Sequence, residues 1–197
     1  MSNHLSDWVP QNVIDDLIDF MDARRTYVRG VVDGELGPAP PLLGPTTLTS
    51  ENSPHGTLFL SEVLAVNESA HEVDGKFPDY IELGNTGLTR SLGGYSITDD
   101  PSEPRKFVFP AGTSIGSGQR LMLYADSGPG QGIRLGFSLN GAGEYVLLFN
   151  SAGTLVDSVV FGPQVENLSI GRTGPGEINW VLTLPTPGAL NQPHSLG

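Results

Sequence analysis

The feature that most limits the fold is a regular alternation, over residues 57–192, of short apolar runs with turns rich in glycine and proline. The chain holds 26 Gly and 16 Pro in 197 residues, more of each than average composition would give. No stretch of this region keeps a helical period for three turns. The spacing predicts an all-β sandwich with strands at 58–65, 79–83, 95–98, 107–109, 120–125, 133–139, 144–149, 155–161, 168–171 and 180–182.

Aromatic residues supply much of the large apolar side-chain area in this region, and we expect most of them to lie in the core. They are Tyr80, Tyr95, Tyr124, Phe137, Tyr145, Phe149, Phe161 and Trp180. The alternation at 144–149 places Tyr145, Leu147 and Phe149 on the same side of one strand.

The residues outside the β region differ in character. Residues 1–33 predict one amphipathic helix over about 10–32, with aspartates in its first half and arginines in its last turns, as the helix dipole favours. Its apolar stripe is Val13, Ile14, Leu17, Ile18, Met21, Tyr27, Val28 and Val31. Residues 34–56, rich in Pro, Gly and Thr, predict a semi-rigid linker or an ordered arm along the domain, and 193–197 form a tail. The stripe needs a cover: the β domain, a parent domain or a second copy.

Charge and cysteine content exclude several function classes. The net charge is −12 and no cluster of basic residues interrupts the acidity, so we expect neither nucleic acid nor an anionic membrane as a partner. The chain has no cysteine, which excludes disulfides, thiolate metal sites and cysteine nucleophiles. No apolar run approaches the length of a membrane span, and no segment has the pattern of a signal peptide.

An acidic segment after the first predicted strand is the candidate metal site. Calcium takes six to eight oxygen ligands, and carboxylate and amide oxygens gather here. The candidate ligands are Asn67, Glu72, Asp74 and Asp79, joined by Asp99 and Asp100 if the fold brings that loop near. The regular spacing of known calcium loops is missing, so a solvated acidic loop is the alternative. The four histidines show no zinc spacing, and no other cofactor is expected.

Two patterns resemble catalytic motifs. Residues 112–116 (GTSIG) fit a nucleophile elbow, but they lie between two strand signals and His194 is the only later histidine, so we predict a turn. Glu62, Glu82 and Asn85 interrupt apolar strands. Paired carboxylates can hydrolyse glycosides, but we favour a structural role for these polar side chains. We predict no catalytic residues and no enzyme.

Several fragments in a fixed order resemble one family. They are SEVLAVN (61–67), DYIELGN (79–85), LGGYSITDD (92–100), KFVFPAGT (106–113), GFSL (136–139), VDSV (156–159), and GR (171–172) followed by Trp180 and PTPGALN (185–191). Together they resemble the lamin tail domain, an immunoglobulin-like β-sandwich. Tyr80 and Tyr95 replace a more usual Trp, and Gly84 stands where Tyr or Phe is common. The polar positions that match the family motif are Glu62, Asp79, Glu82 and Asn85.

The resemblance implies a non-catalytic binding module of a larger bacterial exported or cell-surface protein, with a protein or carbohydrate partner. No heptad rod of a nuclear lamin is present. Residues 22–28 weakly resemble the tail of CotH-type proteins. The alternative is therefore a docking or self-association domain attached to an absent catalytic domain, such as a CotH-type kinase, nuclease or phosphatase.

Overall fold

The computed structural model describes residues 57–174 and 179–194, so the predicted helix and linker lie outside the described residues. Within the described ranges the chain is all-β, as predicted, and no helix there is suited to crossing a membrane. The strands are β1 (Leu58–Leu64), β2 (Tyr80–Asn85), β3 (Arg90–Ser91), β4 (Ser96–Thr98), β5 (Phe107–Val108), β6 (Ser114–Ile115), β7 (Arg120–Tyr124), β8 (Ile133–Arg134), β9 (Glu144–Phe149), β10 (Leu155–Phe161), β11 (Ser169–Gly171), β12 (Val181–Leu184) and β13 (Gln192–Pro193).

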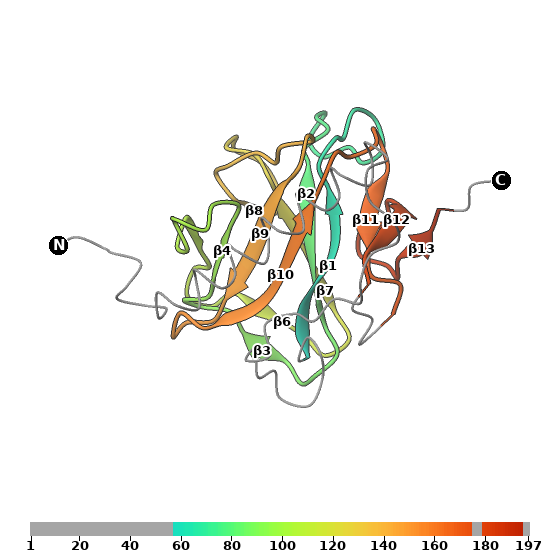
Figure 1. Cartoon of the computed structure of the whole chain (residues 1–197). Helices are drawn as coiled ribbons and strands as arrows, with labels where there is room; N and C mark the ends of the chain where they lie inside the picture. Colours follow the sequence, from blue (N-terminus) through green and yellow to red (C-terminus); the bar gives the residue numbers. More distant parts are fainter. Residues whose placement is uncertain (1–56, 175–178, 195–197) are drawn as a thin grey trace, which may run out of the picture.

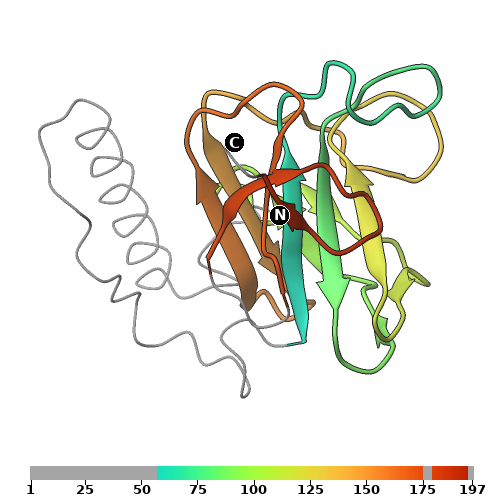
Figure 2. The same ribbon diagram turned by 90° about the vertical axis from the view of Figure 1, so that its right-hand side faces the viewer.

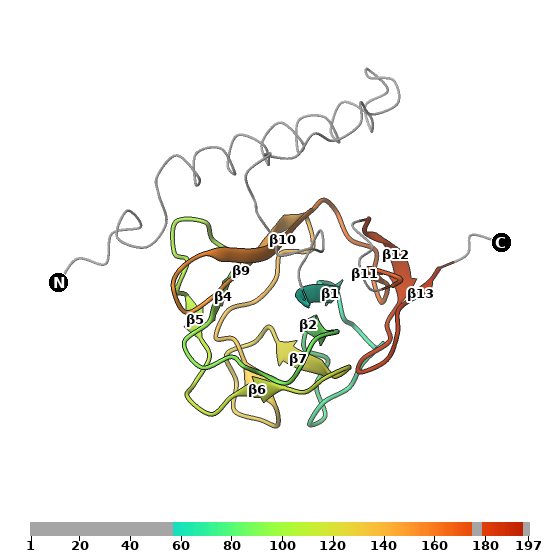
Figure 3. The same ribbon diagram turned by 90° about the horizontal axis from the view of Figure 1, so that it is seen from below.

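The strands form an immunoglobulin-like sandwich of two facing sheets (Figures 1 and 3). One sheet has seven strands in the order β13-β12-β11-β1-β2-β7-β8, and the other has four in the order β10-β9-β4-β5. A short ladder of β3 and β6 lies at one end. All pairings between these strands are antiparallel except that of β8 with β7. The predicted strands at 144–149 and 155–161 are confirmed to the residue.

The core lies between the sheets and follows the alternation of each strand. Its largest fully buried members include Leu60, Ile81, Leu83, Ile97 and Leu123, which come from both sheets. Phe137 and Phe161 belong to this cluster, while Tyr95 and Trp180 pack against it. Tyr80 and Phe149 are buried as well, although they lie outside this cluster, so most of the predicted aromatics are buried. Tyr124 and Tyr145 are only half-buried, because their strand neighbours Leu123 and Val146 occupy the inward positions.

The predicted strand at 133–139 is shorter in the structure. Only Ile133 and Arg134 pair with β7, because the chain turns at Gly136, whose φ is +79°. The alternation of burial nevertheless continues through the turn: Leu135, Phe137 and Leu139 are buried. Burial of alternate side chains is thus compatible with an extended segment that has no strand partner.

A buried ion pair joins the two sheets along one side. The Asp157 carboxylate of β10 accepts a hydrogen bond from the Leu60 amide of β1, with Oδ2 at 2.7 Å from the nitrogen. Arg172 donates to Asp157 through both terminal nitrogens and to the Leu60 carbonyl at 2.8 Å. Its guanidinium also lies 4.7 Å from the ring centroid of Trp180. The side chains of Arg172 and Asp157 are only 2% and 4% exposed.

This arrangement compensates for an irregularity in β1. The register between β1 and β2 shifts between Leu60 and Glu62, and β11 pairs with β1 only from Glu62 onward. Asp157 therefore supplies the acceptor for the Leu60 amide that a neighbouring strand would otherwise provide, which a buried amide needs. The same contacts place Arg172 against Trp180, two residues of the C-terminal sequence fragment.

We expect Asp157→Ala to lower the free energy of unfolding by about 3–5 kcal/mol, because it leaves a buried guanidinium and a buried amide without their acceptor. Urea unfolding of the variant and the parent protein measures the change. Lys106→Met is the matched control, since it breaks a more exposed pair with Asp99 and should cost about 1 kcal/mol or less. Equal losses in the two variants would contradict the assignment.

Candidate functional site

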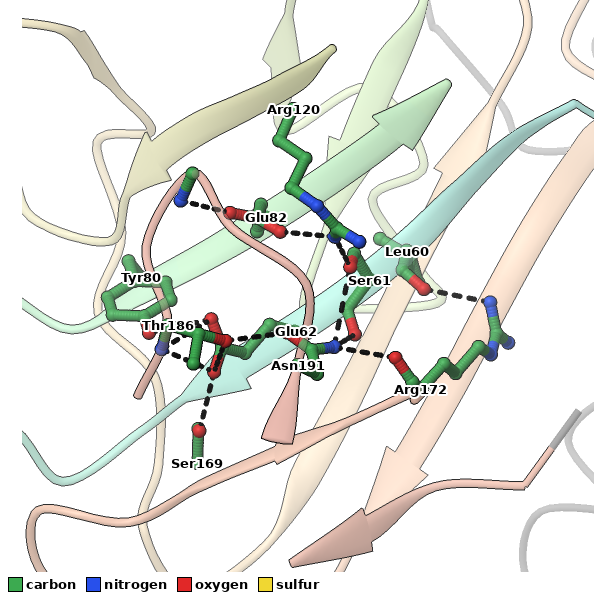
Figure 4. Close-up of polar contacts among 11 residues, drawn as sticks. Leu60, Ser61, Glu62, Tyr80, Glu82, Arg120, Ser169, Arg172, Thr186 and Asn191 are labelled. Carbon is green, nitrogen blue, oxygen red and sulfur yellow. Dashed lines mark hydrogen bonds and ion pairs between the residues drawn. The ribbon is translucent and has the colours of Figure 1, made fainter. Parts of the chain in front are cut away.

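Two carboxylates, Glu62 in β1 and Glu82 in β2, lie opposite each other on the outer face of the seven-stranded sheet. Their neighbours Val63, Ile81 and Leu83 point into the core, so the alternation directs both carboxylates away from it. Both are nevertheless 0% exposed. Figure 4 shows the reason: residues 185–191, which we call the closing segment, cross over them.

Glu62 receives hydrogen bonds from three elements. Tyr80 Oη donates to Oε2 at 2.8 Å, and Ser169 Oγ of β11 donates to Oε1 at 2.7 Å. From the closing segment, Thr186 donates its backbone amide at 3.0 Å and its hydroxyl at 3.3 Å. Charged acceptors form stronger hydrogen bonds than neutral ones, so a single carboxylate fastens β2, β11 and the closing segment to β1.

Glu82 holds the next part of the closing segment. Its Oε2 accepts the Gly188 amide at 2.7 Å, and its Oε1 lies 2.6 Å from Nη1 of Arg120 in β7. Arg120 also donates to Ser61 Oγ. A carboxylate removed from water needs both a counter-charge and hydrogen bonds, and Glu82 has each of them.

The end of the closing segment is fixed by Asn191. Its Nδ2 donates to the carbonyl oxygens of Ser61 at 2.7 Å and Arg172 at 2.8 Å, while its Oδ1 accepts from the Thr186 hydroxyl at 2.9 Å. The PTPGALN fragment and the glutamates of the first two strands are therefore two halves of one set of contacts. A substrate could reach either glutamate only by displacing this segment.

Burial controls the protonation of these groups. It raises the pKa of Glu82, against the opposing effects of the Gly188 amide and Arg120. Burial, together with the charge of Glu62, raises the pKa of Tyr80 far above its usual value. Tyr80 therefore stays protonated and remains a donor to Glu62 at any ordinary pH.

Asn85, the third polar residue that interrupts an apolar strand, ties turns together at the opposite end of the sandwich. Its Nδ2 donates to the carbonyl oxygens of Leu88, Ile115 and Gly116, and its Oδ1 accepts the Gly87 amide at 3.0 Å. An amide that satisfies four backbone groups is a local brace.

The GTSIG pattern at 112–116 forms no nucleophile elbow. Ser114 lies in β6, pairs with Ser91 of β3, and is followed by a turn into β7 rather than by a helix. His194 lies after β13, where its backbone amide donates to the Leu182 carbonyl. A tight strand-to-helix turn is what that motif requires, so the pattern here is a turn next to a short strand.

The predicted calcium ligands of the β1–β2 loop contact the loop itself. Asn67 Oδ1 accepts the amides of Ala70 and His71, and its Nδ2 donates to the carbonyl oxygens of His71 and Pro78. Asp79 Oδ1 accepts the Asn67 amide at 3.0 Å, and burial raises the pKa of this carboxyl. Glu72 is exposed.

The other predicted ligands have partners elsewhere. Asp74 pairs with Arg134 at 3.2 Å, and Asp99 pairs with Lys106 at 2.7 Å. Asp100 accepts from the amide and hydroxyl of Ser102. In the described part of the chain, no three Asp, Glu or His side chains are grouped as cation ligands. Cationic side chains, amides and a hydroxyl therefore already contact the side-chain oxygens of Asp74, Asp99 and Asp100.

Four loops meet at the end of the sandwich where β1 stops, and we call this surface the loop end. It comprises residues 65–79, 125–132, 135–143 and 162–168, seen at the top of Figures 1 and 2. Asn167, whose φ is +59°, accepts with Oδ1 the amides of Glu68, Ser69 and Ala70. The Gln164 amide donates to the Gly141 carbonyl at 2.8 Å, which joins the 162–168 loop to the 135–143 loop.

A stack of side chains braces the same end. The rings of His71 and Tyr124 are stacked with centroids 6.0 Å apart, and the Arg134 guanidinium lies 4.7 Å from the Tyr124 centroid. Arg134 also bridges Asp74 and Asp126, and burial lowers the pKa of His71. The sequence did not indicate a role of Asn167, Tyr124 or Arg134 at this end, because single residues in one loop and two separate strands form no local pattern.

Two apolar side chains remain exposed at this end: Phe77 is 39% exposed and Val165 is 51% exposed. They come from the β1–β2 and β10–β11 loops, which the hydrogen bonds of Asn167 hold together. Asn167 therefore holds the two loops that carry these exposed apolar side chains in a fixed arrangement.

We expect Glu62→Gln to detach the closing segment, because the new amide nitrogen faces donors in place of an acceptor oxygen. The free energy of unfolding should fall by about 1.5–3 kcal/mol, as for hydrogen bonds to charged groups. The hydrogen-exchange rates of the Thr186 and Gly188 amides should rise more than those of the β9 amides. Unchanged protection of both amides would contradict the assignment.

Glu144, at the start of β9, generates a pH prediction. Burial raises its pKa to about 7, against the hydrogen bond from the Asn140 amide and with a further upward effect of Asp99. The folded protein thus binds a proton between pH 4.5 and 7 that the unfolded chain does not, so this group's contribution to stability falls as the pH rises through that window.

Glu144→Gln should therefore flatten the decline in stability between pH 5 and pH 8 and make the protein more stable than its parent at the upper end of the range. Chemical unfolding at a series of pH values tests this. The prediction concerns the difference between the two curves, since Glu82 and Asp79 shift in the same direction. Parallel curves would show that Glu144 does not titrate as described.

Comparison with known proteins agrees with this geometry. The family model of the lamin tail domain matches residues 51–163, which is more than half of the 197 residues. The match spans β1 to β10, while β11, β12 and β13 lie beyond it. No match was found among curated proteins. An immunoglobulin-like sandwich whose family-motif carboxylates fasten its own strands, together with this match, shows that the chain belongs to the lamin tail domain family.

Proposed function

We propose that this domain is a non-catalytic interaction module of a larger bacterial exported or cell-surface protein, and that its loop end binds a protein or carbohydrate partner. The observation that carries the proposal is the loop end itself: Asn67 braces the β1–β2 loop, Asn167 and Arg134 join that loop to other segments, yet Phe77 and Val165 stay exposed.

Rigid loops favour binding for a physical reason. Ordering a flexible loop on contact with a partner costs conformational entropy, and a loop already held in one shape avoids most of that cost. Asn167 alone satisfies three consecutive amides of the β1–β2 loop. A surface of this kind can present a few apolar side chains in a constant arrangement, as the loops of other immunoglobulin-like domains do.

Charge narrows the class of partner. Glu68, Glu72 and Glu166 are exposed at the loop end, with Lys76 as an exposed cation among them. Phosphate-rich or strongly acidic partners would be repelled, whereas a neutral carbohydrate or a protein surface with basic residues would not.

The use of the family-motif carboxylates supports the non-catalytic part of the proposal. Glu62 and Glu82 are fully buried and accept hydrogen bonds from the protein's own strands and closing segment. A general acid or nucleophile must reach its substrate, and these two cannot do so while the closing segment is in place. The module would then supply recognition, and any chemistry would belong to another domain of the parent protein.

The test is binding by the full chain to arrays of surface carbohydrates and to the other domains of the parent protein. Phe77→Ser combined with Val165→Ser should weaken binding at least tenfold, since both side chains would lie at the contact. Leu88→Ser is the matched control: Leu88 is 87% exposed but lies at the opposite end of the sandwich, so binding should not change. Binding lost only in the control, or turnover that Glu62→Gln abolishes, would overturn the proposal.

A further inference from the structure

The outer face of the four-stranded sheet is largely apolar, which is unusual for a face that would contact water. Leu147 and Phe149 alternate with the core residues Val146 and Leu148, so they point outward. Residues paired across neighbouring strands share a face, which adds further members. With Leu147 and Phe149, the face comprises Tyr145, Leu155, Ser158, Val160, Ser96, Thr98 and Val108, and none of these is charged.

An antiparallel sheet of a sandwich ordinarily turns polar residues to solvent. This face is instead closed to water at its centre, where Leu147 and Phe149 are buried, while Leu155 and Val160 are half-buried. The β4–β5 loop lies over the β4 side, since Ser96 Oγ donates to the Pro104 carbonyl at 2.7 Å. In the strand order β10-β9-β4-β5, strands β9 and β10 form the half of the sheet on the other side of β4 from β5.

We propose that this face is the docking site of the chain's own N-terminal segment, residues 10–32, packed as an amphipathic helix. Its stripe supplies the matching chemistry. Val13, Ile14, Leu17, Ile18 and Met21 repeat at three- and four-residue spacing, and none is charged. Asp15, Asp16 and Asp19 fall between these residues and would face solvent.

The path of the chain leads to this face. Residue 57 precedes β1, and the first half of β1 lies beside β10, as the contact of Leu60 with Asp157 shows. Because β10 is the outer strand of the four-stranded sheet, the preceding chain leaves the domain next to that strand. Residues 33–56 can span roughly 80 Å when extended, far more than the roughly 15 Å width of a four-stranded sheet.

The lengths also agree. The six residues of β9 extend for about 20 Å, and about 13 residues of helix cover that distance. The part of the stripe from Val13 to Met21 fits within this length. A tether between segment and face raises their effective concentration to the millimolar range, so the chain's own segment outcompetes a second copy at ordinary protein concentrations.

The lack of cysteine in the chain allows a direct test. In the full-length protein, Ile18→Cys combined with Val160→Cys should form an intramolecular disulfide under mild oxidation, seen as a monomer that migrates faster without reductant. Two control pairs should each crosslink at least tenfold less. Asp19→Cys with Val160→Cys moves the thiol off the stripe, and Ile18→Cys with Val181→Cys uses an exposed residue of β12 in the other sheet.

Equal crosslinking in all three pairs would overturn the proposal, as would a disulfide-linked dimer from the first pair, which would assign the face to a second copy. A second measurement does not depend on cysteine chemistry. Leu17→Asp in the full chain should raise the hydrogen-exchange rates of the backbone amides of β9 and β10 at least tenfold, whereas Asp16→Asn should not. No difference between these two variants would also contradict docking.

Discussion

Buried charge needs a partner, and this requirement organises the domain. Glu62, Glu82 and Asp157 are all nearly or fully inaccessible to water, and each accepts hydrogen bonds from segments far away in the chain. Leaving any one of them unpaired would cost several kcal/mol, a large part of the net stability of a domain of this size. The sheets and the closing segment therefore pack so that these three carboxylates contact their hydrogen-bond donors.

The consequence is a division of labour between the interior and the loops. These polar residues are used internally: Glu62 and Glu82 hold the closing segment, Asp157 and Arg172 join the sheets, and Asn85 braces the turns. The loop end carries exposed side chains on a frame that these internal contacts hold in place.

Sequence reasoning succeeded where a local pattern repeats. The strands 144–149 and 155–161 were predicted to the residue, because clear alternation is bounded there by glycine-containing turns. It failed where pairing is short or depends on distant segments, as at β3, β6 and β13, which have two residues each. Alternation at 133–139 persisted as burial, but the turn at Gly136 removed the strand partner.

The sequence by itself determined the all-β class, the approximate positions of most strands along the chain, the acidity and the polar positions that interrupt apolar strands. Composition and periodicity act within a few residues of one another, so they can be read without coordinates. Only the tertiary structure decided what those polar positions do. Glu62 and Thr186 are 124 residues apart and carry no mutual signal, and their contact exists because β1 and the closing segment meet on one face of a sheet. The tertiary structure likewise decided the contacts of the expected calcium ligands: Asp74, Asp79, Asp99 and Asp100 accept from nearby donors, while Glu72 is exposed.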